Sequence, residues 1–226
     1  MEFGVIIAAR TGSARLPGKV LLPLMGLPVL VFLLRRLKTS QMTSRFIVAT
    51  TDRPEDNSLA EVAEKEGARV FRGSSDNVLG RYVLAARGES FDYAVRATGD
   101  CPFIDGTTLD RVLKQCVALP SYDLVSTKPA FPHGIDYEIY PKVLFEQIDQ
   151  DNPTPEEREH ICNYIYSRSG QYNIVRLTPP SDMVCAQRLF LLDTPEDYSR
   201  MCRLLDGEHD IHISPADVIR KYNHEN

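Results

Sequence analysis

The sequence predicts an α/β fold in three layers, in which a doubly wound, mostly parallel sheet carries helices on both faces. Short apolar runs without polar interruption, such as residues 3–8, are typical of strands buried on both faces. These runs alternate along the chain with longer segments of helical character, an order typical of parallel sheets. A chain of 226 residues with 43% hydrophobic composition can enclose one sizeable core. We therefore expect a single domain over residues 1–226.

Strands and helices are most regular in the first half of the chain. After residues 3–8 and a basic loop, Pro28 suits the first turn of a helix that ends in basic residues. Gly67 ends the next helix, because glycine readily adopts the left-handed conformation that follows many helices. We expect strands at residues 3–8, 46–50, 68–71, 93–97 and 122–125, and helices at 29–38, 58–66, 76–87 and 107–119.

The pattern changes at residues 128–158. The stretch "KPAFPHGIDYEIYP" is punctuated by prolines and alternates in polarity over residues 135–140, so we expect an extended excursion or a hairpin. Such an excursion covers a substrate or pairs with a second subunit, and the sequence leaves both alternatives open. A helix is expected near Glu156 and a strand at residues 190–192. Thr194, followed by Pro195, and Ser214 each predict the start of a further helix.

Composition excludes several classes of protein. A net charge of −5 argues against a general nucleic-acid binder, which carries a basic surplus. Pro23, Gly26 and Pro28 interrupt the apolar stretch 20–34, which is also too short for a membrane span. The first residues lack the pattern of a signal peptide. Five scattered cysteines without a C-x-x-C pair predict buried, reduced thiols. We therefore expect a cytoplasmic protein with neither nucleic acid nor membrane as partner.

The segment "IIAARTGSARLPGKVL", residues 6–21, leads from a buried strand into a loop with three cations, Arg10, Arg15 and Lys19. Its small residues let backbone N–H groups approach anionic oxygens. The two arginines can make bidentate contacts, and the lysine adds a mobile point charge. The loop therefore predicts a bound polyanion such as a triphosphate. The alternative is a solvated turn with incidental basic residues.

Two well-known phosphate-binding patterns do not match this loop. A Walker A loop, G-x-x-x-x-G-K-[ST], needs a hydroxyl after its lysine, but Val20 follows Lys19. The spacing from Gly12 to Gly18 is also one residue too long. The dinucleotide fingerprint G-x-G-x-x-G is absent.

Two aspartates directly follow expected strands, Asp100 in "TGDCP" and Asp193 in "LLDTPED". Ligands of parallel sheets collect at the carboxyl ends of the strands. The family resemblance given below implies a metal at Asp100 and Asp193, and these residues fit magnesium, which uses one or two carboxylates together with phosphate oxygens and water. The alternatives are helix capping for Asp100 and, for Asp193, a favourable position ahead of a helix.

The chain resembles, over most of its length up to about Tyr198, the cytidylyltransferases that activate acidic sugars. These include the 3-deoxy-manno-octulosonate and acylneuraminate enzymes and especially the spore-coat polysaccharide type. The residues that carry the resemblance, in the same order, are "IIAARTGSARLPGKVL", "VATTDRPEDN", "VFRGSSDNVLGRY", "TGDCPFID", "GIDYEI", "EREHI" and "LDTPED". The resemblance implies a Rossmann-like fold of the nucleotide-diphospho-sugar transferase kind. It also implies transfer of CMP from CTP to a sugar hydroxyl with release of pyrophosphate, and Mg²⁺ as cofactor.

Matching positions imply residue roles. Arg10, Arg15 and Lys19 would hold the triphosphate and Asp100 and Asp193 the metal, with the three cations and Asp100 as the catalytic residues. Contacts to the nucleotide are expected in the basic loop, after the second strand and in "RGSSDNVLGR", at Ala8, Ala9, Gly12, Ser13, Asp52, Arg72, Ser74, Ser75 and Arg81. Two alternatives remain, Asp76 as a helix cap and Asp52 as a turn residue.

The acceptor is expected to contact five residues, His133, Asp136, Glu138, Arg158 and His160. The first three follow one face of an extended segment and suit hydroxyls or a second metal. Arg158 and His160 suit a carboxylate, or they simply begin a helix. The chain departs from the spore-coat type at Ala8, where those relatives carry glutamine, and at His133, where they carry an acidic residue. The second departure leaves the identity of the sugar open.

Two other functions stay open. A glycosyltransferase of similar fold would use a nucleotide sugar, with "DYE" at Asp136 as its acidic metal motif, although a diphosphate donor needs less positive charge than this loop carries. A non-catalytic subunit would bind CTP without releasing pyrophosphate. For the enzyme, we expect CTP and a sugar as substrates, surface-glycan biosynthesis as its context and, by family resemblance, a homodimer.

Overall fold

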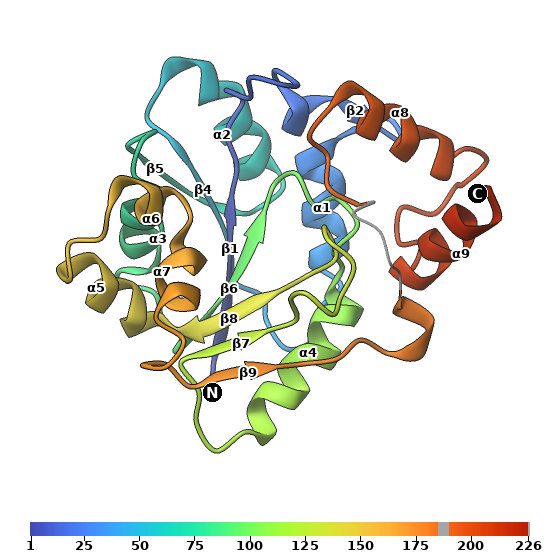
Figure 1. The fold of residues 1–226 in the computed structure, drawn as a ribbon. Coiled ribbons are helices and arrows are strands. Elements are labelled where there is room, and N and C mark those ends of the chain that lie inside the picture. Colours follow the sequence, from blue (N-terminus) through green and yellow to red (C-terminus); the bar gives the residue numbers. More distant parts are fainter. Residues whose placement is uncertain (185–189, 226) are drawn as a thin grey trace.

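A seven-stranded sheet lies between two layers of helices in the computed structural model, which describes residues 1–184 and 190–225 (Figure 1). The spatial order of the strands is β5-β4-β1-β6-β8-β7-β9. Their bounds are Phe3–Ala8 for β1, Phe46–Thr51 for β4, Arg69–Gly73 for β5, Tyr93–Thr98 for β6, Leu124–Ser126 for β7, Glu138–Pro141 for β8 and Ile174–Arg176 for β9. A small hairpin of β2 (Pro23–Leu24) and β3 (Leu27–Pro28) precedes the first helix.

The order of the strands reverses next to β1. From β1 the chain moves outward to β4 and β5 and then returns to β6 on the other side, and these four strands are parallel. In doubly wound sheets such a reversal opens a crevice outside the carboxyl ends of the two strands. The basic loop follows β1 and "TGDCP" follows β6, so both segments lie at this crevice.

Each face of the sheet carries its own hydrophobic core. One core joins Phe3, Val5 and Ile7 of β1 to one group of helices, namely α1 (Val29–Leu37), α2 (Asn57–Lys65), α4 (Gly106–Ala118), α8 (Pro195–Leu204) and α9 (Pro215–Glu225). The other core joins Ile6 and Ala94 to α3 (Val78–Ala86), α5 (Lys142–Gln150) and α7 (Ile161–Ser167). The three-layer, mostly parallel fold expected from the sequence is confirmed.

Two helix starts differ from the expected ones. α3 begins at Val78, and its N-cap is Asn77, which accepts a hydrogen bond from the Gly80 N–H at 2.8 Å; Asp76 as the cap is therefore wrong. α4 is capped by Asp105, whose carboxylate accepts the Thr108 N–H at 2.7 Å. Since Asp105 fills this role, helix capping does not account for Asp100.

The segment at residues 128–158 holds both expected and unexpected structure. β8 runs antiparallel to both β6 and β7, so the hairpin alternative is right. Its second half contains helix α5, which packs on α3, and the start of α6 (Pro155–Glu159), which is capped by Thr154. Only residues 127–137 therefore lie outside regular elements between β7 and β8. β9 was not expected, because a run of three residues has too little period to recognise.

The strand expected at residues 190–192 is wrong. This segment makes single backbone hydrogen bonds to two loops instead of a ladder, from the Phe190 N–H to the His133 carbonyl at 3.3 Å and from the Leu192 N–H to the Asp100 carbonyl at 2.8 Å. Gly134 has φ +94°, and a Cβ there would collide with the Phe190 backbone. Glycine at this position therefore lets the segment lie against the hairpin.

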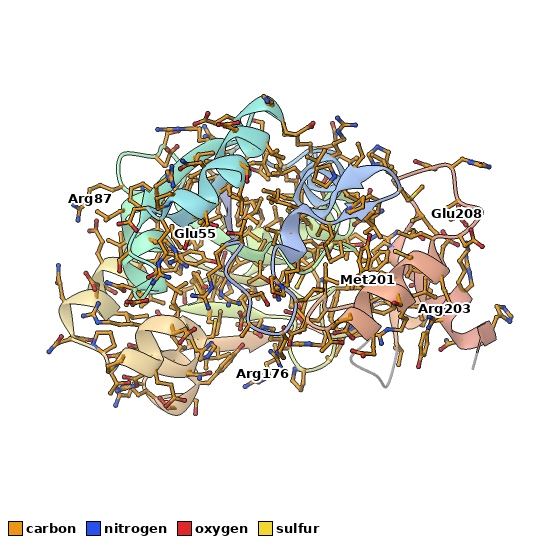
Figure 2. All side chains as sticks on the ribbon, turned by 90° about the horizontal axis from the view of Figure 1, so that it is seen from above. Glu55, Arg87, Arg176, Met201, Arg203 and Glu208 are labelled. Atoms are coloured by element: carbon orange, nitrogen blue, oxygen red, sulfur yellow. The ribbon has the colours of Figure 1, made fainter. Side chains whose placement is uncertain are left out.

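Apolar side chains lie mostly in the core and charged side chains mostly at the surface. Met201 of α8 is buried, whereas charged side chains such as Arg87 and Arg203 lie on the outside (Figure 2). The free cysteines Cys101, Cys116 and Cys162 are buried as expected, but Cys202 is exposed, and Cys185 lies outside the described residues. Within residues 1–184 and 190–225, no helix is long and apolar enough to cross a membrane.

Candidate active site

A pocket of about 450 Å³ opens at the carboxyl ends of β1 and β6, where the strand order reverses. The basic loop and the loop after β6 form much of its wall, and the rest comes from β1, β6, α3, the end of α6 and the segment before α8. Its polar lining consists of Arg10, Ser13, Arg15, Lys19, Arg81, Arg96, Thr98, Asp100, Glu159, His160 and Asp193. All four residues expected to be catalytic are among them.

Asp56 fastens the beginning of the basic loop. Its carboxylate accepts the Thr11 N–H at 2.7 Å and the Thr11 hydroxyl at 2.6 Å, and the Thr51 hydroxyl also donates to it. Burial would raise the pKa of Asp56, but these hydrogen bonds outweigh it and lower the pKa below its usual value. Gly18 closes the loop with φ 68° and donates its N–H to the Thr11 carbonyl at 2.9 Å. The loop is therefore held at both ends.

Lys19 joins the two aspartates of the pocket. Its Nζ lies 2.7 Å from Asp100 Oδ2 and 3.3 Å from Asp193 Oδ1, and its side chain is only 12% exposed. Arg15 also pairs with Asp193, but its side chain is 70% exposed. Arg10 lies 3.5 Å from Glu159. The backbone bond from Leu192 to Asp100 holds Asp193 beside Asp100, although they are 93 residues apart in the chain.

The same two carboxylates are suited to a magnesium ion. Both contact one ammonium group, so their oxygens lie close enough to share a cation. In the part of the chain that the structure describes, no group of three or more His, Cys, Asp or Glu side chains could hold a metal ion. Two carboxylates completed by phosphate oxygens and water are the coordination that magnesium accepts, so the donor set fits this ion.

The structure brings five of the nine residues expected to contact a nucleotide to the pocket, Ala8, Ala9, Gly12, Ser13 and Arg81. Asp52, Arg72, Ser74 and Ser75 do not line it. Arg72 instead binds the Thr51 and Arg53 carbonyls at 2.9 and 2.7 Å. The buried Arg81 donates to the Ser74 and Ser75 carbonyls at 2.7 and 3.3 Å, so it supports that loop from inside the pocket.

Of the five residues expected to contact the acceptor, only His160 lines the pocket. Arg158 pairs with Asp149 at 2.6 Å, which joins α6 to the end of α5. His133 lies in the hairpin loop and holds the segment before Asp193 through its carbonyl. Asp136 contacts Lys128 at 3.2 Å.

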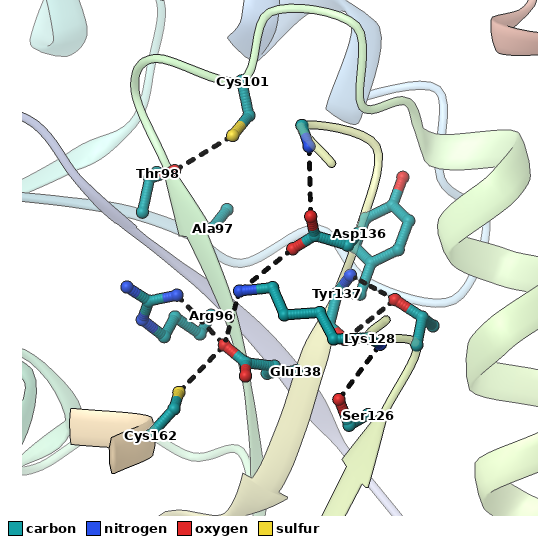
Figure 3. Close-up of polar contacts among 12 residues, drawn as sticks. Arg96, Ala97, Thr98, Cys101, Ser126, Lys128, Asp136, Tyr137, Glu138 and Cys162 are labelled. Atoms are coloured by element: carbon teal, nitrogen blue, oxygen red, sulfur yellow. Dashed lines mark hydrogen bonds and ion pairs between the residues drawn. The ribbon is translucent and has the colours of Figure 1, made fainter. Parts of the chain in front are cut away.

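Glu138 lies behind the pocket in a buried polar network (Figure 3). It is 1% exposed and receives hydrogen bonds from Arg96 at 3.0 Å, Cys162 at 2.9 Å and Tyr166 at 2.7 Å. Lys128 lies 3.4 Å from the same carboxylate. The residue of this network that lines the pocket is Arg96.

Sequence reasoning did not single out Arg96, Thr98 or Glu159 in the pocket. A signal for Arg96 was present, because "YAVRAT" places one charged residue inside an otherwise apolar strand. Asp56 gave no comparable signal, because its partner Thr11 is 45 residues away.

Comparisons with known proteins agree with this geometry. The cytidylyltransferase family model matches residues 4–208. The spore coat polysaccharide biosynthesis protein SpsF of Bacillus subtilis is 33% identical over 199 residues, which are 85% of this chain and 82% of that protein. A 3-deoxy-manno-octulosonate cytidylyltransferase of Bdellovibrio bacteriovorus is 32% identical over 250 aligned positions, covering 92% of this chain and 99% of that protein.

Among solved structures, a cytidylyltransferase from Leptospira borgpetersenii superposes with a TM-score of 0.92 at 33% identity, and the match covers 100% of this chain and 95% of that one. The matched residues include the basic loop, "TGDCP" and "LLDTPED", which all contribute to the pocket. The chain therefore belongs to the cytidylyltransferase family and is a nucleotidyltransferase.

Proposed function

We propose that this protein transfers CMP from CTP to a hydroxyl of an acidic sugar and releases pyrophosphate, with Mg²⁺ as cofactor. The observation that carries the proposal is the position of Lys19 Nζ, 2.7 Å from Asp100 and 3.3 Å from Asp193, at the switch point of the sheet. A cationic loop and two convergent carboxylates are what a triphosphate and its metal ion require.

The reaction is a displacement at the α-phosphate. Negative charge builds up on the phosphoryl oxygens and on the departing pyrophosphate, so catalysis rests on positioning and electrostatic stabilisation. Arg10, Arg15 and Lys19 supply positive charge at the loop, and backbone N–H groups of Gly12 and Ser13 orient the phosphates. Asp100 and Asp193 would hold a magnesium ion, which would supply further positive charge and would lower the pKa of the attacking hydroxyl.

Calorimetric titration with CTP, UTP, ATP and GTP in the presence of magnesium tests the nucleotide. We expect preference for CTP, and we expect Lys19→Ala to weaken CTP binding roughly 10- to 100-fold, because a charge-assisted contact to phosphate is lost. Arg87→Ala is the matched control, since Arg87 is also cationic but pairs with Glu146 and does not line the pocket.

Pyrophosphate release with acidic sugars then tests the transfer. Preference for a nucleotide sugar over CTP would contradict the proposal and favour a glycosyltransferase. If the protein binds CTP but releases no pyrophosphate with any sugar, the transfer reaction is contradicted and a non-catalytic CTP-binding subunit is favoured.

The name of the Bacillus subtilis relative supports a role in surface polysaccharide biosynthesis. We also propose that the enzyme works as a homodimer in the cytoplasm, where CTP is made. Light scattering after size exclusion tests the dimer, and a mass of one 25.5 kDa chain would contradict it.

A further inference from the structure

Arg96 is a charged residue in the middle of a strand whose neighbours are apolar. It lies on β6 opposite Ile6 of β1 and opposite Glu138 of β8. A charge at such a depth costs free energy unless it is paired and hydrogen-bonded. The chain nevertheless keeps a guanidinium there, on the floor of the pocket between β1 and β6.

The network behind Arg96 fixes its charge and its orientation (Figure 3). Glu138 accepts one guanidinium N–H at 3.0 Å, and it is itself held by Cys162 and Tyr166. Lys128 is shared between Glu138 and Asp136, at 3.4 and 3.2 Å. Because these other partners hold Glu138 from α7 and the hairpin, the carboxylate that pairs with Arg96 has a fixed position.

Glu138 occupies only part of the donor capacity of Arg96. A guanidinium carries five N–H donors in a planar fork. Its Nε is buried and has no hydrogen-bond partner within the described residues. A buried donor without a partner is costly, and a paired fork matches the two oxygens of a carboxylate. The Arg96 side chain is 19% exposed and lines the pocket, so a carboxylate there would accept guanidinium N–H groups that Glu138 leaves unused.

The position of Arg96 separates it from the triphosphate. Lys19 and Arg15 already gather at Asp100 and Asp193, beyond the end of β6. Arg96 lies two residues before Thr98, about 7 Å further down the strand at ~3.3 Å per residue. The neutral oxygens of a pyrimidine need no full charge, because uncharged donors such as Thr98 and backbone N–H groups also line this pocket.

We propose that Arg96 binds the carboxylate of the acceptor sugar and that Glu138 acts as a positioning residue for it. The proposal rests on the proposed function. The sequence led us to expect that Asp136 and Glu138 contact the sugar directly. In this proposal the group that contacts the sugar is the guanidinium of Arg96, and Glu138 holds that guanidinium in place.

The test compares acids with their neutral carboxamides. Pyrophosphate release is measured with CTP, magnesium and a panel of eight- and nine-carbon 2-keto-3-deoxy sugar acids, each beside its amide. We expect the wild type to favour an acid over its amide, and Arg96→Gln to raise KM for the acid roughly 10- to 100-fold with little change in kcat. In this variant the preference for acid over amide should disappear, and Arg96→Lys should restore part of it.

Controls separate this role from others. Arg87→Gln should keep the wild-type preference, because Arg87 pairs with Glu146 and does not line the pocket. CTP affinity measured by calorimetry should stay within threefold in Arg96→Gln. If Arg96→Gln fails to fold, Arg96→Gln/Glu138→Gln removes both charges of the buried pair together.

The proposal would be overturned if the wild type binds CTP but uses the amides as well as the acids, or uses no acid of the panel. It would also be overturned if Arg96→Gln raises KM for the acid and for its amide by the same factor. A loss of CTP affinity in Arg96→Gln as large as the loss of acceptor affinity would contradict it too. Failure of the wild type to bind CTP would instead overturn the proposed function.

Discussion

Glu138 shows how a single buried carboxylate can remain charged. Burial alone would raise its pKa, but Arg96 and Lys128, together with hydrogen bonds from Cys162 and Tyr166, lower the pKa to about 2. Opposite charges and donors to the ionised form both favour the carboxylate. Arg96 is the counterpart, because the groups around it raise its pKa above the usual value despite burial. The pair is therefore ionised throughout the physiological range.

The low pKa of Glu138 predicts a contribution to acid stability. Its pKa in the folded protein, about 2, lies below the ordinary value of 4.5, so the ionised form stabilises the fold above pH 4.5, and this is lost as the pH falls towards 2. At 1.36 kcal/mol per pKa unit the contribution is about 3 kcal/mol. Urea unfolding between pH 7 and pH 2.5 measures it, and Glu138→Gln should lose stability less steeply with acid than the wild type.

Glu61→Gln is the control for this experiment, because Glu61 is exposed on α2. Its acid dependence should equal that of the wild type. Equal slopes for the wild type and Glu138→Gln would contradict the low pKa.

At the scale of elements, the start of α3 links local sequence to the pocket. Val78 and Arg81, on its first turn, both line the cavity. The capping bond from the Gly80 N–H to Asn77 therefore sets the direction in which these two side chains leave the helix. Asp76, one residue earlier, is exposed and bonds to the Ser75 hydroxyl at 2.6 Å.

This assignment predicts different outcomes for two neighbouring substitutions. Asn77→Ala should lower the free energy of unfolding by about 1 kcal/mol, the usual cost of a lost N-cap. Asp76→Ala should change it by less than about 0.5 kcal/mol, as is common for exposed positions. Thermal or urea unfolding decides between them, and the opposite ranking would show that Asp76 caps the helix.

For the whole molecule, Arg36 joins segments that are far apart in the sequence. Its side chain is 0% exposed and donates to the carbonyls of Ile211 at 2.6 Å, Ile213 at 2.7 Å and Phe103 at 3.0 Å. These contacts fasten helix α1 to the loop before α4 and to the segment before α9. Burial lowers the pKa of Arg36, and Asp105, 3.9 Å away, opposes this effect.

Arg36→Met should therefore lower the free energy of unfolding by roughly 2–4 kcal/mol, because buried carbonyls lose their donors. Its neighbour provides the control. Arg35 pairs with Glu66 at the surface at 2.8 Å, and Arg35→Met should cost much less than Arg36→Met, because an exposed ion pair contributes little to stability. Differential scanning calorimetry compares the two, and equal losses would contradict the structural role of Arg36.

The sequence by itself determined the layered fold, most strands and helices, and which loops carry the charged residues of the pocket. Apolar runs, caps and turn residues are local signals, and so are a basic loop after β1 and aspartates after expected strands. These signals were enough to place Arg10, Arg15, Lys19 and Asp100 at one edge of the sheet, where the structure finds them. Asp193 lies there too, but the strand at residues 190–192 from which its position was inferred is not formed.

Only the tertiary structure decided which polar residues face the pocket and which support it. Arg96 meets Glu138 across 42 residues and Thr11 meets Asp56 across 45, and both contacts depend on which strands are neighbours. Of the expected acceptor residues, Glu138 does not line the pocket, because β8 pairs with β6 and buries it. Side-chain orientation across a sheet follows from strand order and register, which no local pattern in this chain records.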